Sequence, residues 1–189
     1  GDTDLRQLRF GIEVEMTGIT REKASQVAAS YLGGESLYLG TYYKTYAATD
    51  SQGRMWKFTY DGSIQAEKKE NGERVPADKP YKTEMVSPIC TYEDIPTIQE
   101  LVRQLRHKGA FSNSSTGIHI HVDASSFDAR TLRNLVNLFY SKEDLLFAAL
   151  KVDPARWAYC SPTDERFLQE LNRKRPQTIK AFQKLWYGG

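Results

Sequence analysis

The sequence predicts an α+β fold in which helices cover one face of an antiparallel sheet. Strand-like and helix-like segments are mixed along the chain without regular alternation, and no internal repeat occurs, which is typical of this class. Two segments, around 8–17 and 116–123, carry apolar residues at every second position, as strands do when one face is buried. With 189 residues the chain suffices for one domain with a substantial core. We therefore expect a single domain over residues 1–189.

The first half of the chain is expected to contain a strand, a helix and a β-hairpin. The strand covers about 8–17, and Thr20 can cap a following helix that ends near residue 32 at a Gly-Gly pair. Residues 42–64 are rich in Tyr, Thr and Phe, and the sequence Asp-Ser-Gln-Gly at 50–53 predicts a hairpin turn between two strands.

The remaining elements are more varied. Residues 67–79 are polar and without periodicity, so we expect a mobile loop there. A short strand over 82–88 and an amphipathic helix over 94–108 follow. Helical patterns return at about 128–151 and 163–186, the second of them interrupted by a proline.

Composition and charge exclude some classes of partner. The net charge of +2 is too mild to indicate a nucleic-acid partner, and no apolar run reaches the length of a membrane span. Cys90 and Cys160 lie 70 positions apart and form no metal or redox motif. We expect both to be reduced, buried thiols in a cytoplasmic protein.

Two strands place ligand-type side chains on the face opposite their apolar residues. His119 and His121 share one face of the strand around 116–123, and Glu13 and Glu15 share one face of the first strand. Adjacent carboxylates repel each other, and a bound divalent cation usually offsets that repulsion. The combination predicts a metal-dependent active site on an open sheet face.

Each of these patterns also has an ordinary structural explanation. Two glutamates in an isolated Glu-x-Glu on a strand are more often solvated than bound to a metal ion. The two histidines of a single His-x-His are about equally often structural residues and metal ligands. Asp61 belongs to Tyr-Asp-Gly-Ser, which is also a good turn sequence, and Glu84 alone would be unremarkable. The four potential ligands taken together favour the metal site.

Four segments in this order resemble the amidoligase family, which belongs to the carboxylate–amine ligase superfamily with glutamine synthetase and glutamate–cysteine ligase. They are FGIEVEM at 10–16, DGSI at 61–64, EMVSPI at 84–89 and GIHIHVD at 117–123. The resemblance runs from about residue 8 to residue 187. It implies a glutamine synthetase-like funnel of antiparallel strands with helices behind, ATP as co-substrate, and two or more Mg²⁺ ions.

The resemblance also implies roles for individual residues. It makes Glu13, Glu15, Glu84 and His121 metal ligands, and it places Asp61 near the substrate end of the site. His119 and His121 would lie near the metals and phosphates, where each can hold a phosphate oxygen, accept a proton from the amine or bind metal. The residues expected to contact ATP are Glu15, Lys57, Lys82 and His121. For each of the two lysines, the alternative is that its side chain is solvated and has no role in the site.

The implied reaction joins a carboxylate to an amine. Transfer of the γ-phosphoryl group of ATP to the carboxylate gives an acyl phosphate, which the amine attacks to form an amide or isopeptide bond. The substrates expected are an amino acid, a peptide, a cell-wall precursor or a protein side chain. Two other functions remain open: a metal-dependent hydrolase using the histidine strand with a softer ion such as zinc, and a catalytically incomplete binding module.

One departure from the family concerns the end of the sequence. In the resembled family, further strands that carry a glutamate–arginine pair follow the last aromatic helix, whereas this sequence ends at Gly189. We therefore expect the domain to lack the C-terminal strands of the family, and a second chain to be a possible partner that completes the site.

Overall fold

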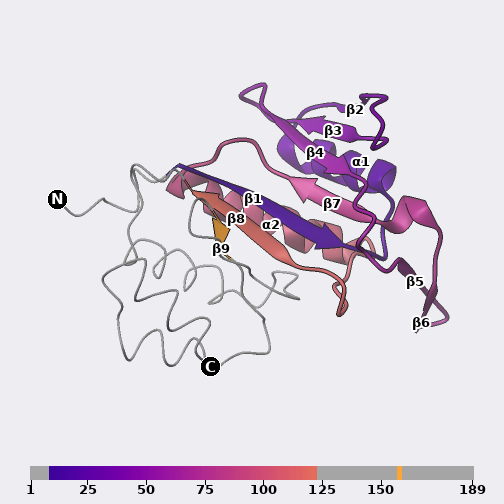
Figure 1. Ribbon diagram of the computed structural model, residues 1–189. Coiled ribbons are helices and arrows are strands. Elements are labelled where there is room, and N and C mark those ends of the chain that lie inside the picture. The colour runs from indigo at the N-terminus through magenta and orange to yellow at the C-terminus, as the bar shows by residue number, and fades with distance from the viewer. Residues whose placement is uncertain (1–8, 123–156, 159–189) are drawn as a thin grey trace, which may run out of the picture.

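The computed structural model describes residues 9–122 and 157–158, and within them it confirms the α+β class (Figure 1). The larger sheet has seven strands in the order β2-β3-β4-β7-β1-β8-β9, and every described pairing is antiparallel. These strands are β1 (Phe10–Met16), β2 (Ser36–Tyr38), β3 (Tyr46–Thr49), β4 (Met55–Thr59), β7 (Thr83–Val86), β8 (Ile118–Val122) and β9 (Trp157–Ala158). A separate two-stranded sheet is formed by β5 (Glu67–Glu70) and β6 (Glu73–Pro76).

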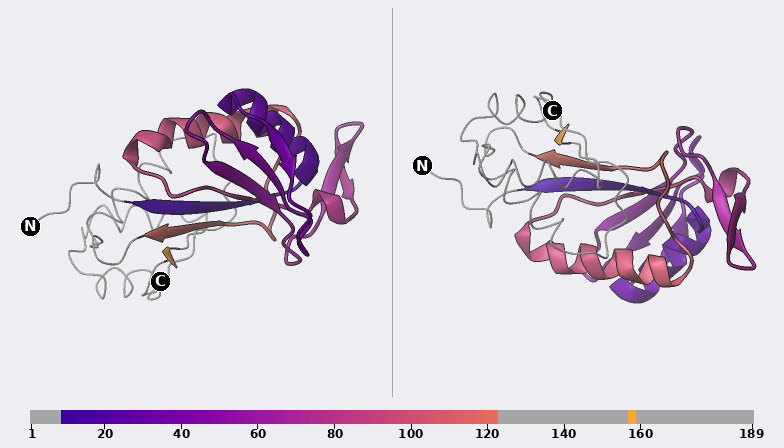
Figure 2. Two further views of the ribbon diagram at one scale, coloured as in Figure 1. Left: turned by 90° about the horizontal axis from the view of Figure 1, so that it is seen from above. Right: turned by 90° about the horizontal axis from the view of Figure 1, so that it is seen from below.

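Two α-helices, α1 (Arg21–Leu32) and α2 (Ile95–His107), lie on the same face of the larger sheet (Figure 2). Two short 3-10 helices, η2 (Lys79–Tyr81) and η3 (Tyr92–Asp94), precede β7 and α2. Helix α1 begins and ends where the sequence predicts, because the Thr20 hydroxyl accepts a hydrogen bond from the Lys23 amide and Gly33 adopts the left-handed conformation at the C-cap. None of the helices in this part of the chain is long and apolar enough to cross a membrane.

The core lies between the helices and the sheet. Alternate residues of β1 are buried, including Ile12 and Val14, and α2 contributes the apolar stripe that its sequence predicts. Trp56 and Phe58 of β4 are fully buried, while Lys57 between them is exposed on the opposite face. One face of the central strands is therefore occupied by packing, which leaves the other for polar side chains.

The prediction of a loop at 67–79 is wrong, because most of this segment forms the β5–β6 hairpin. Asn71 and Gly72 both have positive φ, as a two-residue hairpin turn requires. The buried Thr17 hydroxyl anchors the hairpin through bonds to the amide and carbonyl of Glu67. Strand periodicity is absent because both faces of the hairpin are largely exposed, so the Asn-Gly pair is the signal that identifies it.

Other expectations differ from the structure in extent. The hairpin predicted over 42–64 is confirmed, but its strands are shorter and run only over β3 and β4. The exposed three-residue edge strand β2 was not predicted. Cys90 is buried and free, as expected, and burial raises its pKa to about 11. The helical patterns at 128–151 and 163–186, and Cys160, lie outside the described residues.

Candidate metal site and active site

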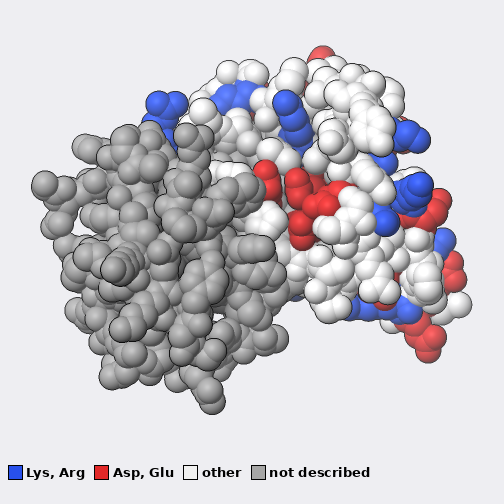
Figure 3. Space-filling model, viewed as in Figure 1, with Lys and Arg blue, Asp and Glu red and all other residues white. Residues whose placement is uncertain are grey.

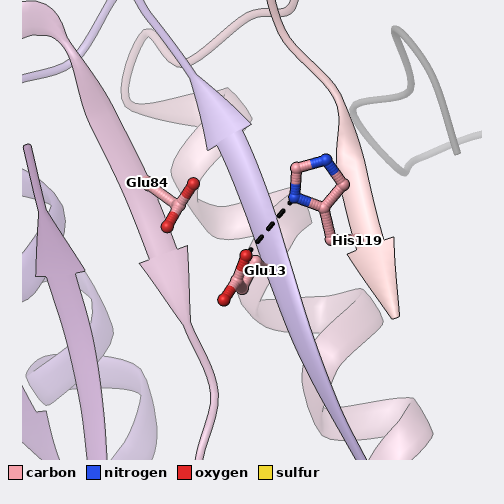
Figure 4. Close-up of side chains that lie close together, drawn as sticks. All are labelled: Glu13, Glu84 and His119. Atoms are coloured by element: carbon pink, nitrogen blue, oxygen red, sulfur yellow. Dashed lines mark hydrogen bonds and ion pairs between the residues drawn. The ribbon is translucent and has the colours of Figure 1, made fainter. Parts of the chain in front are cut away.

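The central strands β7, β1 and β8 bring the predicted ligands together through their register. Glu15 lies directly opposite Glu84 on β7, and Glu13 lies opposite His119 on β8. Directly opposed residues of antiparallel strands project to the same face, with their Cβ atoms about 5 Å apart. Figure 4 shows Glu13, Glu84 and His119 projecting from three neighbouring strands toward one another.

The side chains form two overlapping groups able to hold a metal ion. One consists of Glu13, Glu84 and His119, and the other of Glu15, Asp61 and Glu84; within each group, one ligand atom per residue lies within 4.8 Å of the others. Glu84 belongs to both groups. We call these five residues the carboxylate cluster; in Figure 3 acidic atoms gather near the centre of the viewed face.

Asp61 reaches the cluster from the turn after β4. Its Oδ1 accepts hydrogen bonds from both the amide and the hydroxyl of Ser63, so the turn interpretation of Tyr-Asp-Gly-Ser is correct. The same turn brings the Asp61 carboxylate within reach of Glu15 and Glu84. The turn and the candidate site are therefore compatible explanations of this residue.

Glu13 is held between the two histidines. Its Oε2 lies 3.3 Å from His119 Nδ1 and its Oε1 lies 3.1 Å from His121 Nε2. Burial by itself would raise the pKa of Glu13, but the hydrogen bonds and charges of His119 and His121 outweigh that effect and lower the pKa to about 2. Glu13 is therefore ionised at neutral pH.

Glu15 and Glu84 are shifted in the opposite direction. Burial and the neighbouring Asp61 raise the pKa of Glu15 to about 8. Burial, the Glu13 charge and Asp61 raise the pKa of Glu84 to about 9. Burial also acts to raise the pKa of Asp61, but hydrogen bonds from Ser63, Glu15 and Glu84 lower it overall. Protons on Glu15 and Glu84 thus offset the repulsion among crowded carboxylates, and a bound cation can take their place.

The two predicted lysines lie beside the cluster. Lys57 of β4 is opposite Val86 of β7, which is in turn opposite Glu13, so the three residues form one row across the open face. The Lys82 Nζ donates a hydrogen bond to the Gly62 carbonyl at 3.3 Å and thereby supports the turn that carries Asp61.

Two recesses are lined by neighbours of cluster residues, although no cluster residue itself lines either one. One, of about 370 Å³, is lined by Gly11, Ser87 and His121 among others. The other, of about 500 Å³, is lined by Arg21, Tyr60 and several further tyrosines. Tyr60 immediately precedes Asp61, so this second recess begins one residue from the cluster.

A third recess, of about 510 Å³, is lined by residues outside the cluster. It surrounds Arg54, which forms ion pairs with Asp50 and Asp94 at 2.9 Å each. Asp50 also accepts a hydrogen bond from the Trp56 indole, so these charges hold the β3–β4 turn against η3.

Sequence reasoning missed three residues of the first two recesses: Gly11, Arg21 and Tyr60. Gly11 lies opposite His121, and a Cβ placed there would meet no atom of the described residues within 4 Å, so with respect to them the glycine leaves open space on the site face. Arg21 is buried although it is the first residue of α1, where the helix dipole disfavours a positive charge. That unfavourable position was the available signal for Arg21.

The fold and the cluster define an α+β protein with a carboxylate-rich site on the open face of its sheet. A family model described as "Putative amidoligase enzyme" matches residues 6–189. The chain belongs to this family, as the four motifs indicated, and the activity that the family is named for is that of a ligase. No curated protein and no solved structure matches the chain.

Proposed function

We propose that this protein is an ATP- and Mg²⁺-dependent carboxylate–amine ligase that forms an amide or isopeptide bond through an acyl phosphate. The observation that carries the proposal is Glu84, which belongs to both metal-binding groups. A carboxylate shared between two cation positions is suited to phosphoryl transfer, where metal ions bridge phosphate oxygens and neutralise developing charge. The open face would then form part of the wall of a glutamine synthetase-like funnel.

The donor set favours magnesium over zinc. Four carboxylates and one histidine make up the two groups, and hard divalent cations such as Mg²⁺ prefer oxygen ligands. Zinc sites usually recruit more nitrogen or sulfur, whereas neither group found in the described residues contains both His119 and His121. The donor set therefore supports the ligase over the hydrolase. When bound, the magnesium ions would supply positive charge to the phosphate oxygens.

The reaction has two steps. An oxygen of the substrate carboxylate attacks the γ-phosphorus of ATP, and the bond from that phosphorus to the bridging oxygen breaks to release ADP. The amine nitrogen then attacks the acyl carbon, phosphate leaves with the electron pair of the C–O bond, and the nitrogen loses a proton. Ionised Asp61, at the edge of the cluster beside the second recess, is our candidate for orienting the amine and accepting that proton.

The remaining residues have supporting roles in this scheme. Glu13, Glu15 and Glu84 would hold the cations, with His119 completing one group. His121, the histidine predicted as a metal ligand, belongs to neither group, and it remains a proposed contact of the nucleotide together with Lys57 and Lys82. The recess beside Gly11 and His121 would receive the nucleotide, because Gly11 offers no side chain to obstruct it. The substrates remain those expected from the family resemblance, a second chain remains a proposed partner, and the cytoplasm remains the proposed location.

Titration calorimetry of a non-hydrolysable ATP analogue, with and without magnesium, tests the proposal. We expect binding that requires magnesium, is lost in Glu13→Gln, and is retained in Glu73→Gln, a matched change at an exposed position of the β5–β6 hairpin. Circular dichroism would verify that both variants are folded. Magnesium-independent binding, or full binding by Glu13→Gln, would contradict the metal assignment. Bound zinc with ATP-independent cleavage would indicate the hydrolase, and ligand binding without turnover would indicate the binding module.

A further inference from the structure

The recess beside Tyr60 has features that the proposed chemistry at the carboxylate cluster does not use. We call it the tyrosine recess; its lining includes Arg21, Tyr38, Tyr42, Tyr43 and Tyr60. These residues come from the start of α1, from β2, from the β2–β3 connection and from the segment after β4. A cavity of about 500 Å³ is large enough for a small organic ligand.

Arg21 is a buried charge whose hydrogen-bonding capacity is only partly used. The residue is 5% exposed; its Nε donates to the Lys44 carbonyl at 3.2 Å, and its Nη1 donates to the carbonyls of Lys79 and Lys82 at 2.9 Å each. A guanidinium has five N–H groups, and the hydrogen bonds that Arg21 makes to described residues use Nε and Nη1, which leaves Nη2 open to water or a ligand.

No carboxylate pairs with Arg21 among the described residues; each hydrogen-bond partner of its guanidinium is a backbone carbonyl. Carbonyls satisfy N–H groups but do not neutralise a charge, and buried charges in proteins are normally paired. The position of Arg21 at the N-terminus of α1 adds to the cost, because the helix dipole is positive there. An anionic group bound in the recess would supply the missing counter-charge.

The walls of the recess are aromatic and accessible. Tyr42 is 92% exposed, Tyr38 58% and Tyr43 54%. The Tyr38 and Tyr46 rings have centroids 4.8 Å apart, and the Arg21 Cζ lies 5.5 Å from the centre of the Tyr60 ring. Clustered exposed aromatic rings are unusual on a surface with no ligand to cover them, and tyrosine rings offer both apolar area and a polar hydroxyl.

We propose that the tyrosine recess binds the free carboxylate of an amino-acid or peptide substrate, with Arg21 Nη2 as its anchor and the rings of Tyr42 and Tyr43 against its apolar part. Lys44 and Lys79 also line the recess and outweigh the charge of Glu22, so its lining favours an anion. A carboxylate, rather than a phosphate, follows from the proposed amide-forming reaction. This inference rests on the proposed function and gives it a substrate class.

The position of the recess connects it to the chemistry. Tyr60 lines the recess and Asp61 belongs to the carboxylate cluster, and Cα atoms of consecutive residues are about 3.8 Å apart. Tyr46 lies opposite the buried Phe58, so the recess is on the helix side of the sheet, and a molecule held there would extend past the end of β4 to bring its reacting group to the cluster. Remote binding of this kind fixes the orientation of a substrate.

The test is a nuclear magnetic resonance titration without magnesium or nucleotide, so that it does not depend on the carboxylate cluster. The probes are N-acetylphenylalanine, its C-terminal amide and phenyl phosphate. We expect the acid to shift the Arg21 Nε–Hε resonance and to bind about tenfold or more tightly than the amide, because the amide lacks the charge that pairs with the guanidinium. Arg21→Met should abolish this preference.

Because Arg21 also bonds to four backbone carbonyls, Arg21→Met can fail to fold, and Tyr42→Ala provides the second variant. Tyr42 is almost fully exposed, so its removal should weaken binding of the acid severalfold without unfolding the protein. Tyr92→Ala, in η3 and outside the recess, is the matched control. Equal binding of acid and amide, tighter binding of phenyl phosphate, or unchanged binding by Tyr42→Ala would overturn the inference. If the ATP analogue binds equally with and without magnesium in the calorimetric experiment, the proposed function is overturned, whereas carboxylate binding in the tyrosine recess is not affected.

Discussion

Glu84 is the residue in which the demands of stability and of the site conflict most strongly. It is partly buried beside Glu13, Glu15 and Asp61, and its pKa is raised to about 9. Without a cation, its ionisation would place another negative charge among existing ones. A residue in such a position costs stability in the metal-free protein, and that cost is recovered only when a cation binds.

The substitution Glu84→Gln separates the effect of this carboxylate on the stability of the metal-free protein from its effect on cation binding. At pH 8, where an unfolded glutamate is ionised and the folded Glu84 still holds a proton, we expect the variant to raise the free energy of unfolding of the metal-free protein by about 1 kcal/mol. The same variant should lose magnesium binding, because both cation positions share this carboxylate. Urea denaturation in EDTA and in magnesium measures both quantities, with Glu73→Gln as the control. Destabilisation in EDTA would indicate that Glu84 has an ordinary structural role.

The residues of the site were only partly predictable from the sequence. Alternation on a strand is local, so it correctly places Glu13 and Glu15 on the face opposite Ile12 and Val14. The contact between Glu15 and Glu84 depends on the register of strands that are 69 positions apart in sequence, which no local pattern determines. Arg21 was missed for a similar reason, because its burial depends on carbonyl groups of two distant segments.

At the scale of the elements, two glycines, one within β1 and one just after it, differ in whether the backbone and its surroundings leave room for a side chain. Gly18, in the turn between β1 and α1, has a φ of +81°, and a Cβ there would overlap the Gly109 carbonyl and the Phe111 ring. At Gly11, within β1, an added Cβ would have no neighbour within 4 Å among residues 9–122 and 157–158. The first glycine is required by the backbone, whereas the second leaves room on the site face.

The pair Gly18→Ala and Gly11→Ala tests this difference with the same chemical change. We expect Gly18→Ala to lower the free energy of unfolding by about 2 kcal/mol or more, because left-handed backbone strain adds to the steric overlap. Gly11→Ala should leave stability unchanged or raise it by up to about 1 kcal/mol, since glycine is unfavourable inside a strand. Thermal unfolding of both variants gives the comparison. Similar losses in the two variants would mean that the Gly11 side of the sheet is more crowded than the structure shows.

Whether a strand can be predicted from the sequence depends on whether one of its faces is buried and the other exposed. Strands β1, β4 and β8 have one buried face each, so their alternation is visible in the sequence. The β5–β6 hairpin is exposed on both faces, and side-chain periodicity therefore carries no information about it. Its sequence signal is Asn71-Gly72, a pair favoured in two-residue hairpin turns. The three-residue strand β2 is too short for any periodicity.

At the scale of the whole molecule, the two faces of the sheet divide packing from chemistry. Helices α1 and α2 lie on one face of the larger sheet (Figure 2), and the carboxylate cluster lies on the other face, over the central strands. The sequence predicted this division, because the apolar stripes of helices and strands have to meet in one core. The strand order was not predictable, since β1 pairs with β7 and β8 rather than with its neighbours in sequence. The positions of the recesses depend on that order, although Tyr38, Tyr42, Tyr43 and Tyr46 could be recognised in the sequence as candidates for lining a cleft, with hairpin packing as the alternative.

The dependence of stability on pH reports the protonation of the whole cluster. Glu15 and Glu84 have raised pKa values of about 8 and 9, against 4.5 for an unperturbed glutamate. As the pH rises above 4.5, the unfolded chain releases protons that the folded chain retains, so these two groups lower the free energy of unfolding until the pH passes 9. Glu13 has the opposite sign: its pKa of about 2 gives stability that is present above pH 4.5 and is lost as the pH falls toward 2.

These contributions predict that the metal-free protein is most stable in mildly acidic solution and loses stability steadily between pH 5 and pH 9. Magnesium should remove most of this loss, because the bound cations replace the protons on Glu15 and Glu84 and bind more tightly as those protons dissociate. Urea midpoints measured across this pH range in EDTA and in excess magnesium should therefore coincide near pH 5 and diverge increasingly toward pH 9. In Glu84→Gln the divergence should be much smaller. Curves that remain parallel at every pH would show that magnesium binds elsewhere than at these carboxylates.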